Sequence, residues 1–289
     1  MTARGQAAAV AGTVYVMVPV HNRRAITESY VRSLAAQTDR GVQLVLIDDG
    51  STDGTADAVR DIMPDAIVIT GKGDWWFGGA MHQGYLWMKL REASPDDLVL
   101  VTNDDVFIEP DFIARGRAAL ATRPRSLVLA QLYTEDGEFV EAGVEVDWKR
   151  LRFTGVADPE RINCFSTRGL IMRASDFLEI GGFHPHLLPH YLSDYEFTIR
   201  AHRKGFALAT DPLFRLRYDA KTTGNTNIRT GSLRRYIRAR FAKKTATSAF
   251  PYYGSVFLLL VCPRRRLPRN LYRVWRNFVR DCWTEGRSR

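Results

Sequence analysis

Four short apolar segments, separated by stretches with helical spacing, constrain the fold of this chain most strongly. The expected strands are residues 14–20, 42–47, 66–70 and 98–101. The expected helices that follow them are residues 26–37, 55–62, 78–91 and 111–121. This alternation predicts an α/β fold with a mostly parallel, Rossmann-like central sheet and helices on both of its faces. In such sheets ligands bind beyond the carboxyl ends of the strands.

Acidic turns follow two of the expected strands. Asn103, Asp104 and Asp105 come directly after the fourth strand, where their oxygens can converge on a divalent cation such as Mg²⁺ or Mn²⁺. Asp48 and Asp49 follow the second strand, where a carboxylate can accept a hydrogen bond from a nucleobase or a ribose hydroxyl. Helix capping is the alternative role for both clusters. For Asp48 and Asp49, Ser51 or Asp53 can supply the cap. For Asn103–Asp105, the apolar residues on both sides place the acids at a sheet edge, so both patterns favour a ligand site.

The positive charge of the chain is concentrated at its carboxyl end. The net charge is +9, yet residues 220–289 hold 17 Lys and Arg against two acidic residues. Residues 232–283 contain two basic amphipathic stretches with Trp and Phe, which suit an anionic membrane surface. Packing against the rest of the chain, or a subunit contact in a homo-oligomer, is the alternative. Nucleic acid is a weaker third partner and is not expected.

No apolar run approaches the roughly 18 residues that a membrane-spanning helix needs. The cysteines, Cys164, Cys262 and Cys282, have no metal-binding spacing, which favours a reducing, cytoplasmic setting. With the basic stretches, this predicts a peripheral protein on the inner face of the plasma membrane.

Motifs in both halves of the chain occur in a characteristic order. They are VPVHN (18–22), IDDGSTDGT (47–55), NDD (103–105), GLIMR (169–173), IGGF (180–183) and SDYEFTIRAHRKGF (193–206). Together they make the chain resemble the family 2 glycosyltransferases of GT-A fold, with bacterial surface-polysaccharide and rhamnosyltransferase-like members among them. The resemblance covers about residues 14–225.

The resemblance implies an inverting transfer of a sugar from a UDP- or dTDP-sugar to a glycan or lipid-linked acceptor. It also implies that a divalent metal, Mg²⁺ or Mn²⁺, holds the donor diphosphate. Asp194 falls on the general base of the family, and Asp104 and Asp105 fall on its metal motif, with Asn103 in place of the first acid. Asp219 is the candidate third metal ligand, because residues 218–225, where many family members place a histidine ligand, contain no histidine.

The other expected site residues come from the same resemblance. The donor nucleotide is expected to contact Pro19, His21, Asn22, Asp48, Asp49, Gly78, Gly79 and Asp104. The acceptor pocket is expected to contain Trp75, Trp76, Arg168, Gly169, Tyr195 and Glu196. Plain core packing is the alternative for the two tryptophans. Because Asp194 begins a helix, we expect the helix N-terminus to lower the pKa of its carboxyl and keep it ionised near neutrality.

The expected organisation has three parts. A flexible tail over residues 1–12 precedes a GT-A catalytic domain over 13–228, and a basic amphipathic helical segment follows over 229–289. Within the catalytic domain, residues 13–125 form the half that binds the nucleotide-sugar and residues 126–228 the half that binds the acceptor. Two rival functions stay open: a nucleotidyltransferase on a similar sheet, and a non-catalytic sugar-binding or membrane-associated scaffold.

Overall fold

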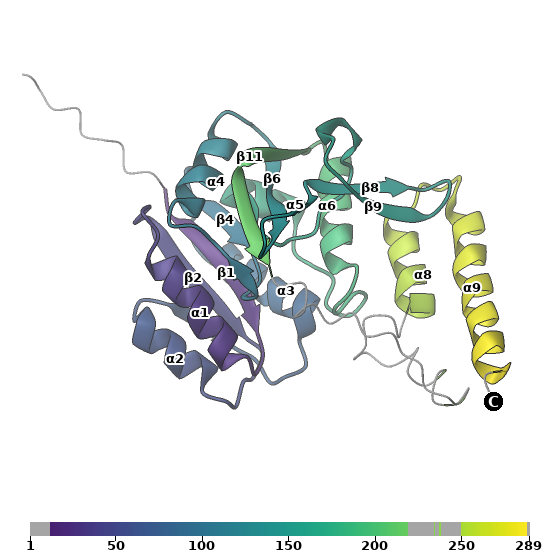
Figure 1. The fold of residues 1–289 in the computed structure, drawn as a ribbon, viewed down its shortest axis with the longest axis horizontal. Coiled ribbons are helices and arrows are strands. Elements are labelled where there is room, and N and C mark those ends of the chain that lie inside the picture. Colours follow the sequence, from purple (N-terminus) through teal and green to yellow (C-terminus); the bar gives the residue numbers. More distant parts are fainter. Residues whose placement is uncertain (1–11, 219–233, 235–236, 238–249, 288–289) are drawn as a thin grey trace, which may run out of the picture.

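A computed structural model describes residues 12–218, 234, 237 and 250–287 of the chain (Figure 1). The described strands of the first half are β1 (Val14–Val20), β2 (Val42–Asp48), β3 (Ile67–Thr70), β4 (Leu98–Val101) and β5 (Val106–Phe107). The helices among them are α1 (Arg24–Ala35), α2 (Thr55–Ile62), α3 (Trp76–Lys89) and, after β5, α4 (Phe112–Ala121). The strand–helix alternation predicted from the sequence is therefore confirmed, with helix boundaries within two residues of those expected.

The second half continues the same sheet with a different pattern. Its elements are β6 (Ser126–Thr134), β7 (Phe139–Glu141), β8 (Gly143–Asp147), β9 (Arg152–Val156), the short 3₁₀ helix η1 (Pro159–Arg161), β10 (Leu170–Arg173), α5 (Ala174–Ile180), α6 (Ser193–Arg203) and β11 (Ala207–Tyr218). Two further helices are α8 (Phe250–Val261) and α9 (Leu267–Arg287). Strand β11, with 12 residues, is the longest of the described strands.

Within the described residues, the main sheet has nine strands in the order β3-β2-β1-β4-β10-β6-β11-β5, with β7 beside β6. The strands β3, β2, β1 and β4 are parallel, so their carboxyl ends meet at one edge. Strand β10 then runs antiparallel between β4 and β6 and makes the second half of the sheet mixed. The expected parallel sheet is thus the first half of the observed one.

Helices cover both faces of the sheet because its strands are apolar on both sides. Side chains of α1, α2 and α4, among them Tyr30, Val59 and Phe112, form one buried layer. Side chains of α3, α5 and α6, among them Met81 and Phe197, form the other. The two layers leave the carboxyl ends of the strands as the open edge of the sheet, where the expected acidic turns lie.

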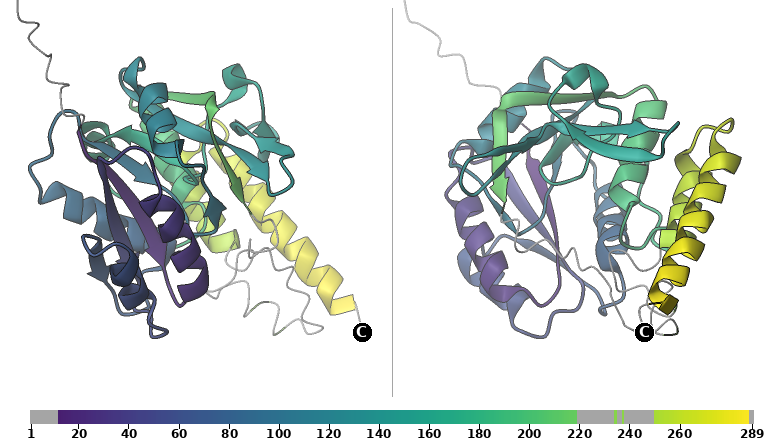
Figure 2. Two further views of the ribbon diagram at one scale, coloured as in Figure 1. Left: turned by 60° about the vertical axis from the view of Figure 1, so that its left-hand side comes forward. Right: turned by 45° about the vertical axis from the view of Figure 1, so that its right-hand side comes forward.

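The two C-terminal helices pack on the second half of the fold (Figure 2). Phe257 of α8 lies against Trp148 and Phe153 of the β8–β9 hairpin, with ring centroids 6.2 and 5.9 Å apart. The guanidinium of Arg203, at the end of α6, donates hydrogen bonds to the carbonyls of Leu260 and Val261. One face of these helices is therefore part of the folded body.

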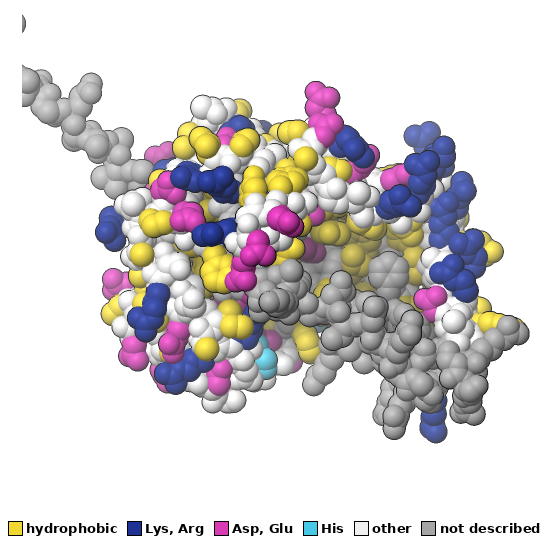
Figure 3. Space-filling model, viewed as in Figure 1, with side chains coloured by type: hydrophobic (Ala, Val, Ile, Leu, Met, Phe, Trp, Pro, Cys, Tyr) yellow, Lys and Arg dark blue, Asp and Glu magenta, His cyan; other side chains and the backbone are white. Residues whose placement is uncertain are grey.

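The opposite face of α9 is exposed. Tyr272, Val279 and Trp283 have exposed fractions of 65%, 63% and 64% and share one stripe of the helix, at successive spacings of seven and four residues. Arginine side chains flank that stripe, and Figure 3 shows Lys and Arg gathered along this edge of the molecule. Among the described helices, none is both long and apolar enough to cross a membrane.

Parts of the expected organisation fall on residues outside the described ranges. Residues 1–11 of the expected tail and the expected boundary at residue 228 belong to this group. Residues 238–249, which include the end of the first basic stretch, also lie outside the described ranges.

Candidate functional site

Two adjoining cavities open at the carboxyl ends of the parallel strands. The first has a volume of about 330 Å³ and the second of about 310 Å³. Their walls share Phe77, Asn103 and His190, so the cavities lie side by side along the edge of the sheet. The first is otherwise lined by residues that follow β1, β2 and β4, and the second by residues of the second half of the fold.

The two acids that follow β2 are both buried and both hydrogen-bonded to the backbone. Asp49 lines the first cavity, and its carboxylate accepts hydrogen bonds from the N–H groups of Gly73, Trp75 and Trp76, each at 2.9 Å. Asp48 lines neither cavity, and its Oδ1 accepts a hydrogen bond from Ser51 N at 2.8 Å. A carboxylate can accept about four hydrogen bonds, so Asp49 has little capacity left for a nucleotide. Its visible role is to hold the loop before α3.

The first motif contributes to the same cavity through two of its three expected residues. Pro19 and His21 lie in the wall, and His21 Nδ1 is 2.7 Å from the carbonyl oxygen of Asp49. Asn22 does not line the cavity, and its expected contact with the donor stays a prediction. Its Oδ1 instead accepts a hydrogen bond from Thr52 N at 2.8 Å, and its backbone has a φ of +50°. This hydrogen bond thus connects the residues that follow β1 to the acidic turn after β2.

The acid pair that follows β4 lies at the inner side of the first cavity. Asp104 is 2% exposed and lines that cavity, while Asp105 lines a neighbouring hollow beside α1. Thr27 Oγ1 donates a hydrogen bond to Asp104 Oδ2 at 2.8 Å. Arg23 pairs with both acids, at 3.1 Å from Asp104 Oδ1 and 3.5 Å from Asp105 Oδ2. Burial raises the pKa of Asp104, and Arg23 opposes that effect.

The residues present fit a divalent cation. Asp105 Oδ1 is buried and has no hydrogen-bond partner among the described residues, whereas Asp104 Oδ1 has the ion-pair contact with Arg23. Buried carboxylate oxygens without a donor are the oxygen ligands that Mg²⁺ and Mn²⁺ prefer. No cluster of three or more metal-ligating side chains occurs in the part of the chain that the structure describes. The expected third ligand, Asp219, lies outside the described residues.

Asp194 lines the second cavity from the first turn of α6. Its Oδ1 accepts a hydrogen bond from Tyr195 N at 2.8 Å. Burial raises the pKa of Asp194 to about 6, against this hydrogen bond and the charge of Arg168. The expected lowering of this pKa by the helix N-terminus is therefore wrong, because desolvation of the carboxylate outweighs the local dipole. A pKa near 6 still leaves the carboxylate mostly ionised at neutral pH.

A second carboxylate, which the sequence did not reveal, lies in the same cavity. Glu141 ends β7, a short hairpin strand, and lines the cavity together with Asp194 and Arg168. Burial raises the pKa of Glu141, and the charge of Asp194 adds to that rise, while Arg168 lowers it. The guanidinium of Arg168 lies 4.8 Å from the ring centroid of Tyr218. The expected acceptor pocket therefore contains two acids and one arginine.

Aromatic rings complete the walls of the two cavities. Trp76 lines the first cavity, and its ring lies 5.5 Å from that of His190. Tyr195 lines the second, and its ring stacks on Phe153 at 5.5 Å. Because Phe153 also contacts α8, the C-terminal helices support this wall from behind. Trp75 instead packs against the buried layer beneath α3, so the two adjacent tryptophans differ in role.

Four expected site residues have structural roles instead. A Cβ on Gly78 would lie 2.4 Å from Leu188 O, and Gly79 packs beside Trp75, so both glycines face protein rather than a ligand. Gly169 has a φ of +83° and lies against Leu216. Glu196 is 2% exposed and pairs with Arg200 at 2.7 Å, and it lines neither cavity. The contacts of these four residues with the substrates stay predictions.

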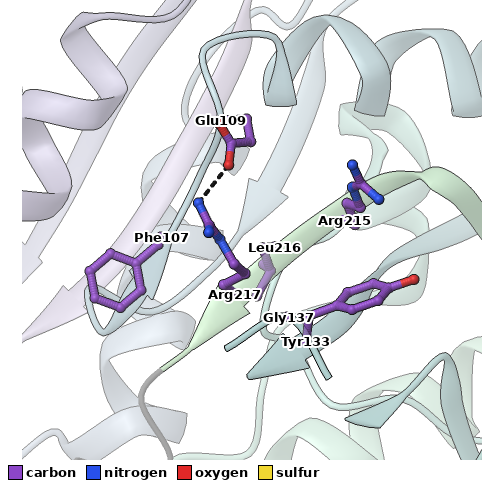
Figure 4. A pocket seen from close by; sticks show the side chains of 7 residues that line it. All are labelled: Phe107, Glu109, Tyr133, Gly137, Arg215, Leu216 and Arg217. Atoms are coloured by element: carbon purple, nitrogen blue, oxygen red, sulfur yellow. Dashed lines mark hydrogen bonds and ion pairs between the residues drawn. The ribbon is translucent and has the colours of Figure 1, made fainter. Parts of the chain in front are cut away.

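A separate surface groove of about 220 Å³ lies where β11 meets β5 and the β6–β7 turn (Figure 4). In it Arg217 pairs with Glu109 at 2.6 Å, while the side chain of Arg215 points away from that pair. Phe107 and Tyr133 also line it. None of the residues expected at the site belongs to this groove.

Comparisons with known proteins agree with this arrangement. A family model described as glycosyl transferase family 2 matches residues 15–178, more than half of the chain. The N-acetylglucosaminyl-diphospho-decaprenol L-rhamnosyltransferase of Mycobacterium tuberculosis is 26% identical over 225 residues, which are 68% of this chain and 73% of the relative.

Two solved structures have a similar fold. The mannosyltransferase PcManGT from Pyrobaculum calidifontis, in complex with GDP-Man and Mn²⁺, aligns with a TM-score of 0.54 at 16% identity and covers 90% of this chain and 73% of its own. S. aureus TarS 1-349, in complex with UDP-GlcNAc, aligns with a TM-score of 0.57 at 16% identity, over 91% of this chain and 71% of its own. At these identities the likeness concerns the GT-A fold alone.

Proposed function

Because the chain belongs to glycosyl transferase family 2, we propose that it moves a sugar from a nucleotide-diphosphate donor to a hydroxyl of a glycan or lipid-linked acceptor, with inversion at the anomeric carbon. A UDP- or dTDP-sugar is the proposed donor, and a deoxyhexose such as rhamnose is one candidate sugar. The name of the mycobacterial relative supports a lipid-linked acceptor, and the UDP-GlcNAc complex of TarS supports a UDP-sugar. The proposed setting is the synthesis of a bacterial surface polysaccharide.

The observation that carries this proposal is the position of Asp194 beside the shared wall of the two cavities. The first cavity would hold the donor and the second the acceptor, so that the anomeric carbon lies near His190. Asp194 would take the proton of the acceptor hydroxyl while the new bond from that oxygen to the anomeric carbon forms. The bond from this carbon to the diphosphate breaks in the same step, which inverts the centre.

A charged neighbour in the second cavity would keep Asp194 in the ionised form that can accept a proton. Arg168 favours the ionised form of Asp194 and lowers the pKa of Glu141 as well. Trp76, Arg168 and Tyr195 remain proposed contacts of the sugars, since each lines a cavity.

Asp104 and Asp105, with Asp219 as a third candidate, would hold the Mg²⁺ or Mn²⁺ ion that the family implies. When bound, this ion would neutralise negative charge on the leaving diphosphate. The chain's own contribution is two buried carboxylates, of which Asp105 keeps an Oδ1 without a hydrogen-bond partner among the described residues.

The exposed face of α9 is proposed to lie on the anionic inner face of the plasma membrane. Three exposed apolar side chains, Tyr272, Val279 and Trp283, share this face with arginines that anionic lipid headgroups would attract. A lipid-linked acceptor would then approach from the same surface. We propose a catalytic domain over residues 13–228 and a membrane-binding segment over 229–289.

The test is a panel of nucleotide-sugars incubated with the protein, Mn²⁺ and lipid-linked acceptors, with products followed by mass spectrometry. Release of a nucleoside diphosphate together with a glycosylated acceptor is the expected result. In a parallel assay with nucleoside triphosphates and sugar 1-phosphates, release of inorganic diphosphate with formation of a nucleotide-sugar would instead identify the rival nucleotidyltransferase, and the absence of nucleotide binding would favour the non-catalytic scaffold. The Asp194→Asn variant is expected to lose transfer by about 10²–10⁴-fold while it still binds the nucleotide.

A further inference from the structure

The guanidinium of Arg23 joins the two acids that follow β4. Its Nη1 lies 3.1 Å from Asp104 Oδ1 and its Nη2 lies 3.5 Å from Asp105 Oδ2. The side chains of the acids are 1% and 8% exposed, whereas that of Arg23 is 33% exposed. In the described part of the chain, no other basic side chain forms an ion pair with either acid. One partly exposed cation therefore compensates two buried carboxylates.

The contacts of Arg23 are weak enough to be exchanged. The distance to Asp105 exceeds the usual range of about 2.7–3.2 Å for an N–H···O hydrogen bond. Asp105 Oδ1 has no hydrogen-bond partner among the described residues. Asp104, by contrast, is also held by Thr27 through its other oxygen. Of the two ion pairs that Arg23 forms, the one with Asp105 is therefore the weaker.

The same guanidinium borders the cavity proposed for the donor. Arg23 lines the first cavity together with Asp104 and Asn103. A guanidinium presents a planar fork of donors that matches a carboxylate pair or a phosphate group equally well. A small movement of this side chain could therefore replace its carboxylate partners with the phosphates of a ligand in the cavity.

We propose that Arg23 is an exchangeable counter-ion of the Asp104–Asp105 pair, which makes binding of a divalent cation depend on a nucleoside diphosphate. This inference rests on the proposed function, because it requires a diphosphate in the first cavity. Without nucleotide, Arg23 occupies the acids and repels a divalent cation. With nucleotide, the diphosphate becomes the partner of Arg23, and the carboxylates become available to the cation.

Charge balance supports this coupling. Two carboxylates and one guanidinium leave one net negative charge at the pair. A divalent cation added alone would place like charges beside each other in a partly buried site, where Coulomb repulsion is much stronger than in water. A diphosphate added with the cation brings the negative charge that both cations need.

The experiment measures Mn²⁺ binding by electron paramagnetic resonance of the free ion, with and without UDP or dTDP. For the unsubstituted protein we expect the nucleotide to tighten Mn²⁺ binding at least tenfold, within the range of about 5–150-fold that is usual for coupled sites. Arg23→Gln is expected to bind Mn²⁺ about tenfold more tightly than the unsubstituted protein without nucleotide, and to lose most of the coupling. The matched control is Arg24→Gln, since Arg24 is the next residue, is exposed and, among the described residues, forms an ion pair only with Glu28, at 2.8 Å.

Thermal unfolding supplies a second measurement, because Arg23→Gln leaves two buried carboxylates unpaired and is expected to lower Tm. Added Mn²⁺ alone should raise the Tm of Arg23→Gln by several degrees more than that of the unsubstituted protein or of Arg24→Gln. The inference would be overturned if Arg23→Gln and the unsubstituted protein had the same Mn²⁺ affinity and the same rise in Tm on addition of Mn²⁺. If no nucleoside diphosphate bound the unsubstituted protein, the proposed function itself would be contradicted. This outcome is distinguishable from the previous one, because it is seen without any substitution.

Discussion

The ring of Trp76 lies 5.5 Å from the ring of His190, at an angle of 53°. This contact joins the loop that Asp49 holds before α3 to the loop that leads to Asp194. Trp76 has a φ of +57° and Leu192 a φ of +68°, values that are costly for residues with a side chain. Such strained residues are retained where the surrounding contacts fix them, and here Trp76 lines the first cavity while Leu192 directly precedes α6, which carries Asp194.

Replacement of Trp76 by Ala should weaken donor binding. The variant removes one wall of the first cavity, and we expect the KM for the nucleotide-sugar to rise about tenfold, which corresponds to about 1.4 kcal/mol. Steady-state kinetics with a varied donor concentration provide the measurement. Trp87→Ala is the matched control, because Trp87 belongs to the same helix but packs against Tyr15, away from both cavities. Equal donor KM values in the two variants would contradict the assignment.

The rate of transfer should depend on the ionisation of Asp194. Burial raises its pKa to about 6, and only the ionised carboxylate can accept the proton of the acceptor hydroxyl. We therefore expect kcat/KM to rise with pH, about tenfold per pH unit below 6, and to level off near pH 7. A profile that is flat from pH 5 to 7, recorded while circular dichroism reports an intact fold, would exclude Asp194 as the titrating base.

The same burial should make Asp194→Asn more stable than the unsubstituted protein at neutral pH. A carboxyl whose pKa is raised by folding binds its proton more tightly in the native state, so it favours folding below its ordinary pKa and costs stability above pH 6. We expect a gain in the free energy of unfolding of about 1–3 kcal/mol at pH 7, which vanishes near pH 4.

Urea unfolding at both pH values checks this expectation. Asp147→Asn is the control of opposite sign, because backbone hydrogen bonds from Arg150 and Lys149 lower the pKa of Asp147. That variant should be less stable than the unsubstituted protein at pH 7. A loss of stability in Asp194→Asn at pH 7 would mean that desolvation is not the dominant effect there.

Glu141→Gln should impair use of the acceptor and spare the donor. Glu141 lines the second cavity and not the first, so we expect the acceptor KM to rise severalfold and the Kd of the nucleotide to stay unchanged. Calorimetry with nucleotide and kinetics with a varied acceptor concentration separate the two effects. Glu138→Gln, an exposed residue of the same hairpin, should behave like the unsubstituted protein. A weaker nucleotide affinity in Glu141→Gln would count against this division of the cavities.

Charge reversal on α9 should reduce binding to anionic vesicles. We expect Arg276→Glu with Arg280→Glu to lower the partition onto phosphatidylglycerol vesicles at least tenfold, since each basic residue contributes about 1 kcal/mol near such a surface. Co-sedimentation measures the bound fraction, and added salt should weaken binding by the unsubstituted protein. Arg32→Glu on α1 is the control. Equal binding to neutral phosphatidylcholine vesicles would argue against an electrostatic membrane contact.

The sequence predicted the first half of the fold well because its signals are local. Apolar runs such as residues 14–20 and 98–101 are continuous, and each is followed by polar residues that emerge at the same sheet edge. Parallel pairing of the strands then brings Asp49 and Asp104 to one cavity. The motif around residue 194 likewise placed its acid in the adjoining cavity.

The remaining site residues could not be found in this way, because their roles depend on distant partners. Arg23 is one of many arginines until the fold places it beside an acid 82 residues further along. Glu141 lies in a hairpin without a recognisable motif. The sign of the pKa change at Asp194 depends on burial that no helix-terminal rule includes.

The hydrogen bond from Gly78 N to Pro189 O, at 2.8 Å, has a consequence for the substitutions that this chain can accept. The backbone of the loop before His190 lies where any β-carbon at position 78 would be. In a library that samples all twenty amino acids, we expect position 78 to admit glycine alone, whereas the neighbouring Trp76 can change with the sugar that is transferred. New donor specificities would therefore have to arise from substitutions at other positions of the cavity and not from substitution of Gly78.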